Sequence, residues 1–145
     1  MRVLGLDIGA RRIGVAISDP LGRVATPLKV LDARSLASDL TPLRRLAVDY
    51  EVELLVAGLP LTLAGEEGPQ AADVRAKADE LACALRLPLE LWDERLSTAE
   101  AMRSMSASGV SARDSKAAVD MVAAALILQG YLDSRRVRGS DGDAG

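Results

Sequence analysis

The order of the apolar runs along the chain restricts its fold more than any other sequence feature. Three short runs, residues 2–7, 13–18 and 24–31, follow one another closely, and the last two are separated by the turn Asp19-Pro20-Leu21-Gly22. Residues 54–58 form a continuous apolar run, which is typical of a buried central strand. Three successive strands, followed by a fourth further along the chain, predict a sheet that begins as a meander.

Helical patterns occupy the space between the later strands. A helix is predicted between Ser35 and Tyr50, and one option places Thr41 as its cap with Pro42 at the first helical position. From Gly68 to Leu85 apolar residues recur at helical spacing with charged residues between them, which predicts an amphipathic helix. Leu89–Trp92 then reads as a fifth short strand.

The last part of the chain predicts two further helical segments and a tail. Ser97-Thr98-Ala99-Glu100 is a capping-box signature, and Ser111 is expected to cap a last helix that runs to about Asp133. The twelve residues that follow have no apolar pattern, so residues 134–145 are expected to be a disordered tail. The order β-β-β-α-β-α-β-α predicts an α/β fold with a five-stranded mixed sheet covered by helices, in one domain over residues 1–133.

Composition narrows the class of protein. Hydrophobic residues make up 49% of the 145 residues and charged residues 27%, the balance of a globular chain. Asp120 interrupts the longest apolar stretch, so no membrane span is expected, and the N-terminus is too short in apolar residues for a signal peptide. We therefore expect a cytoplasmic protein. Cys83 is the only cysteine, which excludes an internal disulfide and multi-cysteine zinc sites.

The chain contains no histidine, and this absence excludes many kinds of catalysis. Ser-His-Asp triads, Cys-His pairs, histidine-ligated metals and imidazole acid–base chemistry all require that residue. Any catalysis must therefore use carboxylates, Lys, Arg, hydroxyl groups or a bound metal ion.

Two carboxylates stand out by their position. Asp7 follows an apolar strand and lies between two glycines, at the kind of strand end where α/β sheets bind ligands, although a turn-forming role fits its position equally well. Asp120 is the one carboxylate in a helical segment that is apolar on every other face. Burying it requires a metal or a partner, and the partner could be Lys116 or an Arg from elsewhere in the chain.

Further acids follow the fifth strand, in Asp93-Glu94-Arg95, although an ordinary solvated loop explains them as well. Together with Asp7 and Asp120 they suggest a site for a hard cation, Mg²⁺ or Mn²⁺, since these ions prefer oxygen ligands. One or two such ions would let clustered carboxylates act on a phosphodiester. The loop 58–69, rich in Gly and Pro, is either a mobile flap at this site or a plain connector.

The cations favour phosphate as a partner, although the net charge is −3. Fifteen of the 18 cationic residues are Arg, whose guanidinium binds phosphate in a bidentate way, but the same enrichment could reflect genomic base composition. The cations that fall near the acids in the sequence could form a phosphate-binding rim: Arg11, Arg12, Arg95, Arg103, Arg113 and Lys116.

At these residues the sequence resembles the YqgF family, also called RuvX, which is related to the RuvC Holliday-junction resolvases. Four blocks in order carry the resemblance: LGLDIGARRIGVAISD, VAGLPLTLAGEEGPQA, WDERLSTAEA and KAAVDMVAAALILQGYLD. The resemblance implies a ribonuclease H-like fold and a cytoplasmic nuclease that acts on the 5′ end of pre-16S ribosomal RNA or on branched DNA. It also implies Asp7, Glu94 and Asp120 as the catalytic and metal-binding acids.

One departure from the wider fold concerns the second acid. Ribonuclease H-like nucleases generally place it at the end of the fourth strand, where this chain has Gly58. The role then passes to Glu94, with Asp93 as its competitor. Two other functions stay open: a non-catalytic nucleic-acid-binding module and, more remotely, a phosphate-loop ATPase. A homodimer would suit a four-way junction.

Overall fold

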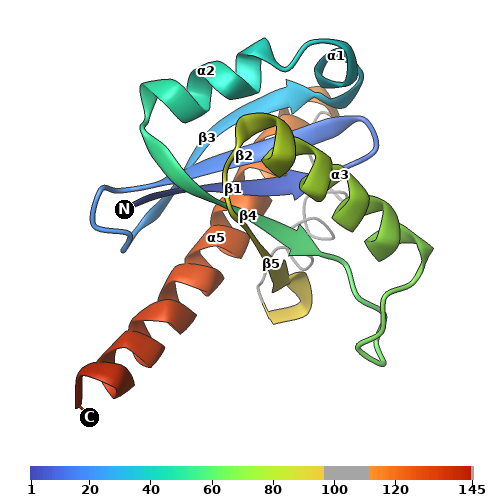
Figure 1. Ribbon diagram of the computed structural model, residues 1–145. Coiled ribbons are helices and arrows are strands. Elements are labelled where there is room, and N and C mark those ends of the chain that lie inside the picture. Colours follow the sequence, from blue (N-terminus) through green and yellow to red (C-terminus); the bar gives the residue numbers. More distant parts are fainter. Residues whose placement is uncertain (97–111, 145) are drawn as a thin grey trace.

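One five-stranded sheet forms the centre of the computed structural model, which describes residues 1–96 and 112–144, with side chains for 1–96 and 117–136 (Figure 1). The strand order is β3-β2-β1-β4-β5. β1, β2 and β3 are antiparallel neighbours, whereas β4 runs parallel to β1 and β5 parallel to β4. The predicted mixed sheet is therefore confirmed, with strands β1 (Arg2–Ile8), β2 (Arg12–Ser18), β3 (Ala25–Asp32), β4 (Val52–Leu59) and β5 (Leu89–Asp93).

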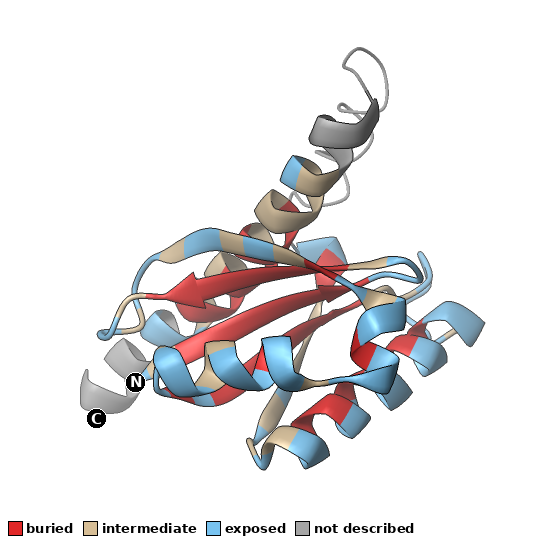
Figure 2. Cartoon of the chain, turned by 90° about the horizontal axis from the view of Figure 1, so that it is seen from above, coloured by how far each residue is buried: buried red, intermediate tan, exposed pale blue. Residues whose placement is uncertain are grey.

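Helices cover both faces of the sheet. One face is covered by three helices: α1 (Ala33–Ser38), α2 (Thr41–Asp49) and α3 (Pro69–Leu85). The long helix α5 (Ala112–Ala144) crosses the other face, and a short 3₁₀ turn, η1 (Glu94–Leu96), follows β5. This is the layered arrangement expected when a sheet is apolar on both sides. Figure 2 shows the central strands buried along their length, while the helices expose their outer sides.

The two faces of the sheet form two separate hydrophobic cores because side chains alternate along each strand. Leu4, Leu6 and Val15 pack towards α1, α2 and α3. Val3 and Val56 pack towards α5, which contributes Ala123, Ala124, Ile127, Leu128 and Leu132. Each core therefore uses every second residue of the same strands.

The helix predicted between Ser35 and Tyr50 is two helices in the structure. α1 ends at Ser38, and α2 begins at Thr41 with Leu40 at its N-cap, so the predicted cap is wrong by one residue. The segment divides into two helices because Pro42 has no backbone N–H to donate and is tolerated only in the first turn of a helix. The capping-box segment 97–100 and Ser111 lie outside the described residues.

Helix α5 corrects one expectation. It continues to Ala144, so residues 134–144 are helical where a disordered tail was predicted; an ion pair between Arg136 and Asp133, with 2.6 Å between Nη2 and Oδ1, supports the helix at i, i+3 spacing. By length and composition alone, residues 117–136 of α5 meet the criteria for a membrane-spanning helix, which a buried core helix also meets. In the fold, however, this segment supplies the side chains that pack on the sheet.

Glycines in β1 and β2 allow α5 to approach the sheet closely. A Cβ at Gly5 would lie 2.7 Å from the Cβ of Leu128, and a Cβ at Gly14 would lie 2.0 Å from the main-chain oxygen of Asp120. Neither position could hold a side chain without a shift of the helix or the strand. A glycine within a strand is thus a sign that another part of the backbone approaches closely.

We expect Gly14→Ala to destabilise the protein by about 1–3 kcal/mol or more, the typical cost of an overpacked core. The added methyl group would meet main-chain atoms of α5, which cannot rotate away as a side chain can. Gly68→Ala is the control for the steric effect, because its nearest neighbour would be Thr62 Cγ2 at 3.4 Å; its cost is limited to the lower preference for Ala at the N-cap of α3. Urea unfolding of both variants tests this; equal stability of the two would contradict the close packing of α5.

Candidate active site

Asp7 lies near the carboxyl end of the central strand β1 and is 9% exposed. In the antiparallel register it stands directly opposite Gly14 of β2. Directly opposed residues of an antiparallel pair point to the same face of the sheet. Asp7 therefore faces α5, because α5 is what a side chain at Gly14 would meet.

Asp120 is carried to the same place by α5. Its main-chain oxygen lies over Gly14, the residue paired with Asp7, so the helix sets the start of Asp120 beside the end of β1. Asp7 and Asp120 therefore lie on the same face of the sheet, and their joint role in a site stays a prediction. The side chain of Asp120 is 19% exposed, so the expectation of a fully buried carboxylate was too strong.

The carboxylate of Asp120 is paired with Arg12. Arg12 Nε donates to Asp120 Oδ2 over 2.6 Å, and the two residues are 108 positions apart in the chain. Arg12 precedes Gly14 by two residues and therefore lies on the same face of β2. This is the structural alternative left open for Asp120, an Arg from elsewhere in the chain. Arg12, expected to bind substrate phosphate, instead contacts an acid here.

The carboxylate of Glu94 lies beside Gly58, near the end of β4. Glu94 belongs to η1, directly after β5, and is 7% exposed. A Cβ built on Gly58 would lie 3.4 Å from Glu94 Oε2 and 2.6 Å from Ile127 Cδ1 of α5. Gly58 therefore makes room for Ile127 of α5, and the carboxylate of Glu94 lies next to it on the α5 face. This geometry explains how an acid from the next strand can replace one at the end of β4.

Asp93, the competitor of Glu94, faces away from Asp7. It pairs in register with Leu59, which belongs to the core on the α3 side, whereas the neighbouring Trp92 packs on the α5 side. Its carboxylate is used by Arg95, whose Nη2 donates to Oδ2 over 2.6 Å and whose Nε donates to Oδ1 over 2.9 Å. The hydrogen bonds from the Arg95 side chain hold the pKa of Asp93 below its usual value. The geometry thus favours Glu94 as the neighbour of Asp7.

Arg95 also ties the loop after β4 to η1. Its Nη1 donates to the main-chain oxygens of Thr62 and Leu63, each over 3.2 Å. Gly65, with φ +82°, lies so close that a Cβ there would be 3.4 Å from Arg95 Nη2. The guanidinium predicted to bind phosphate therefore joins two loops at the edge of the candidate site. In this structure the loop is attached to η1 through its main chain.

The three acids together have the chemistry of a divalent metal site, but they are not assembled as one. Mg²⁺ and Mn²⁺ prefer carboxylate oxygens, which Asp7, Glu94 and Asp120 would supply from three different elements. Within the described parts of the chain, no group of three acidic side chains is placed to hold a metal ion. The contact between Asp120 and Arg12 is one visible reason, since it directs that carboxylate to a guanidinium.

The predicted basic rim is only partly described. Arg11 is exposed in the β1–β2 hairpin, and Arg12 follows it. The side chains of Arg113 and Lys116 are not among those described, and Arg103 lies outside the described residues. The hairpin is thus the described part of the rim on the same side of the sheet as Asp120.

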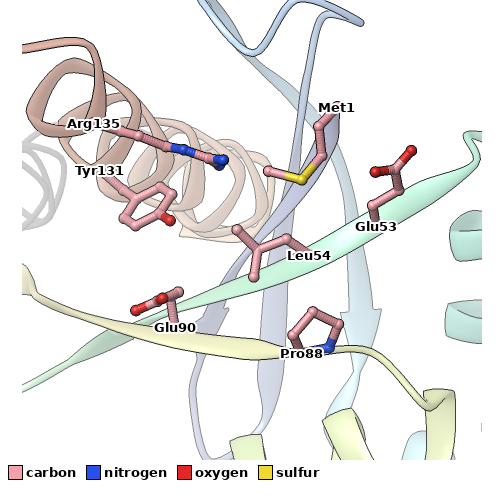
Figure 3. A pocket seen from close by; sticks show the side chains of 7 residues that line it. All are labelled: Met1, Glu53, Leu54, Pro88, Glu90, Tyr131 and Arg135. Carbon is pink, nitrogen blue, oxygen red and sulfur yellow. The ribbon is translucent and has the colours of Figure 1, made fainter. Parts of the chain in front are cut away.

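A separate pocket of about 540 Å³ lies at the opposite ends of β4 and β5 (Figure 3). Two glutamates from the two strands and an arginine from α5 are among the residues that line it. Because β4 and β5 are parallel, their first residues lie far along the strands from Gly58 and Glu94. The pocket is therefore distinct from the acid group; its lining is Met1, Glu53, Leu54, Pro88, Glu90, Tyr131 and Arg135.

Sequence reasoning missed the residues that make room for the acids. Gly14 and Gly58 carry no chemistry themselves, yet each lies against one of the candidate acids. A glycine inside an apolar strand is a signal of close approach by another backbone or group, and it could have been used here. The contact between Arg95 and the main chain of the loop leaves no comparable sequence signal.

The sheet order, the two antiparallel hairpins and the long helix over the acid-bearing face define a ribonuclease H-like α/β protein. A solved structure with this fold is RuvC of Thermus thermophilus, described in complex with a Holliday junction substrate. It superposes with a TM-score of 0.58 at 13% sequence identity and covers 94% of this chain and 96% of that one. At 13% identity this similarity shows only that the two proteins share a fold.

The chain belongs to the RuvX family, described as "Holliday junction resolvase", whose model matches residues 1–134. A relative from Anaeromyxobacter dehalogenans is 49% identical over 135 residues, which cover 93% of this chain and 98% of the relative. A relative from Moorella thermoacetica is 48% identical over 133 residues, 92% and 95% of the two chains. Both are named "Putative pre-16S rRNA nuclease". The family predicted from the four sequence blocks is therefore confirmed.

The pairing of Asp93 with Arg95 makes a testable prediction for stability against pH. Because the pKa of Asp93 is lowered in the fold, its stabilising contribution is complete above the unfolded value of about 3.9 and is lost as pH falls through the lowered pKa. Asp93→Asn should therefore be less stable than wild type at neutral pH and converge with it in strong acid. Asp73→Asn, at an exposed aspartate of α3, is the control. A pH-independent difference in thermal melts would contradict the prediction.

Proposed function

We propose that this RuvX-family nuclease hydrolyses phosphodiester bonds with Mg²⁺ or Mn²⁺ bound by Asp7, Glu94 and Asp120. The observation that carries the proposal is the register of β1 and β2, which sets Asp7 opposite the glycine on which α5 rests at Asp120. Glu94 reaches the same face above Gly58. Three carboxylates on one face, in a chain without histidine, favour metal-assisted hydrolysis over acid–base catalysis by side chains alone.

The chain's own residues would divide the work. A bound divalent ion would activate water and stabilise the leaving oxygen. Asp7 and Glu94, both largely withdrawn from solvent, would hold their carboxylates in a fixed place at the ends of rigid strands. Arg11 and Arg12 would contact backbone phosphates, which fixes the position of the nucleic acid without reading its sequence.

Among substrates we favour a ribosomal RNA precursor, processed at the 5′ end of pre-16S rRNA. The support comes from the names of the relatives, which match this chain over more than nine-tenths of its length at 48–49% identity. Cleavage of branched DNA is the second candidate, favoured by the description of the family model. We place the activity in the cytoplasm, as the resemblance to the RuvX family implies.

A cleavage assay with three substrates tests the choice directly. Single-stranded RNA, a precursor 16S rRNA end and a synthetic four-way DNA junction are offered side by side, each with Mg²⁺, Mn²⁺ or a chelator. Cleavage of the precursor end with Mg²⁺ or Mn²⁺, and not with the chelator, supports the proposal. Cleavage confined to the junction would favour branched DNA, and binding without cleavage of any substrate would favour a non-catalytic binding module.

We expect Asp7→Asn to slow cleavage by more than about a hundredfold while the protein stays folded. Even outer partners of a metal site cost roughly 10–100-fold when removed, and the amide keeps the shape of the side chain but loses its charge. Asp49→Asn, at an exposed position of α2, is the matched control and should cleave as wild type. Wild-type rates for Asp7→Asn in Mn²⁺ would show that the site is misplaced.

A further inference from the structure

The contact between Arg12 and Asp120 is an ion pair inside the candidate site. Arg12 Nε lies 2.6 Å from Asp120 Oδ2, and the side chains are 40% and 19% exposed. Only one of the five N–H donors of a guanidinium is on Nε; the other four, on Nη1 and Nη2, can serve another acceptor. The pair therefore joins a carboxylate on the metal-binding face to a cation that keeps unused donor capacity.

The strength of this pair is modest. Ion pairs with substantial solvent exposure contribute at most about 1 kcal/mol, because water screens the charges and the side chains lose rotational freedom. The Asp120 side chain is mainly covered, whereas that of Arg12 is substantially open to solvent. Arg12 can therefore leave Asp120 at small cost, and the remaining carboxylate then needs another cation.

A divalent ion and Arg12 would compete for the same carboxylate. Asp120 begins beside Gly14, opposite Asp7, so an ion between these acids would bind the same carboxylate whose Oδ2 now accepts from Arg12. Arg12 stands two residues before Gly14, close to the β1–β2 hairpin and the exposed Arg11. A displaced guanidinium at this edge of the site suits a phosphate oxygen, which Arg binds through two donors.

We infer that Arg12 is an exchangeable counter-cation: it neutralises Asp120 in the metal-free protein, gives way to the divalent ion, and then contacts the phosphate of the nucleic acid. The inference rests on the proposed function and adds to it an energetic coupling between metal binding and nucleic-acid binding. Because the ion frees the residue that binds phosphate, metal and nucleic acid each strengthen the binding of the other. Arg12 thereby disfavours nucleic-acid binding to the site without metal.

The decisive measurement is the affinity for Mn²⁺ alone, by calorimetric titration of the full chain. Arg12→Gln removes the competitor, so it should bind Mn²⁺ about fivefold more tightly than wild type, which is the effect of an ion pair of about 1 kcal/mol. Arg11→Gln is the matched control: it removes the same charge from the next residue and should change the affinity much less. The quenching of Trp92, the only tryptophan, which precedes Asp93 and Glu94, gives a second readout.

The second measurement concerns nucleic acid. A short fluorescein-labelled phosphorothioate oligoribonucleotide keeps the phosphate charge but resists hydrolysis, and its binding can be followed by anisotropy. Mn²⁺ should strengthen this binding in wild type clearly more than in Arg12→Gln, whose affinity for Mn²⁺ itself is higher. If Arg12 had a purely structural role, Arg12→Gln would not bind Mn²⁺ more tightly and at the same time show a smaller effect of Mn²⁺ on nucleic-acid binding.

The outcomes separate this inference from the proposed function. If wild type binds Mn²⁺ and Arg12→Gln binds it no more tightly, the exchange is wrong and the metal site stands. If neither protein binds Mn²⁺, both are wrong. Arg12→Lys keeps a positive charge on β2 and provides a variant should Arg12→Gln not fold. Its affinity for Mn²⁺ should lie between those of wild type and Arg12→Gln, and an affinity below wild type would overturn the inference.

Discussion

The packing of α5 on Gly14 is the contact on which the rest of the site depends. Main-chain atoms of Asp120 lie where a side chain at Gly14 would be, and the register of β1 and β2 puts Asp7 directly opposite. If α5 lay further from the sheet by the length of a side chain, Asp120 would no longer lie close to β1. The absence of one Cβ thus determines the distance between two elements that are more than a hundred residues apart in the sequence.

A second glycine has the same role on the other side of β1. Gly58, in the buried stretch of β4, makes room for Ile127 of α5, and the carboxylate of Glu94 from the turn after β5 lies beside it. Arg95, the next residue, joins the carboxylate of Asp93 to two main-chain oxygens of the loop after β4. The turn that carries Glu94 is therefore supported by its own neighbours, and each residue of Asp93-Glu94-Arg95 has a different task.

Electrostatic repulsion explains why such a site contains an internal cation. Three carboxylates on one face repel each other and raise the cost of removing them from water. Arg12 of β2, the strand next to β1, lowers that cost for Asp120 in the absence of metal. The cation belongs to the same hairpin as Asp7, so the strand pairing that places one acid also places the partner of another.

The order and type of the strands could be predicted from the amino-acid sequence, because apolar periodicity reflects which faces of each element are buried, and that property is local. The sequence also indicated Asp7, Glu94 and Asp120, two from their unusual surroundings and all three through the resemblance to the RuvX family. The fold had to be seen to know that Asp93 pairs with Arg95 and Asp120 with Arg12, and that the segment before Tyr50 is two helices. Those choices depend on which groups meet across the sheet, and contacts between residues distant in the sequence leave no periodic pattern that a single chain could reveal.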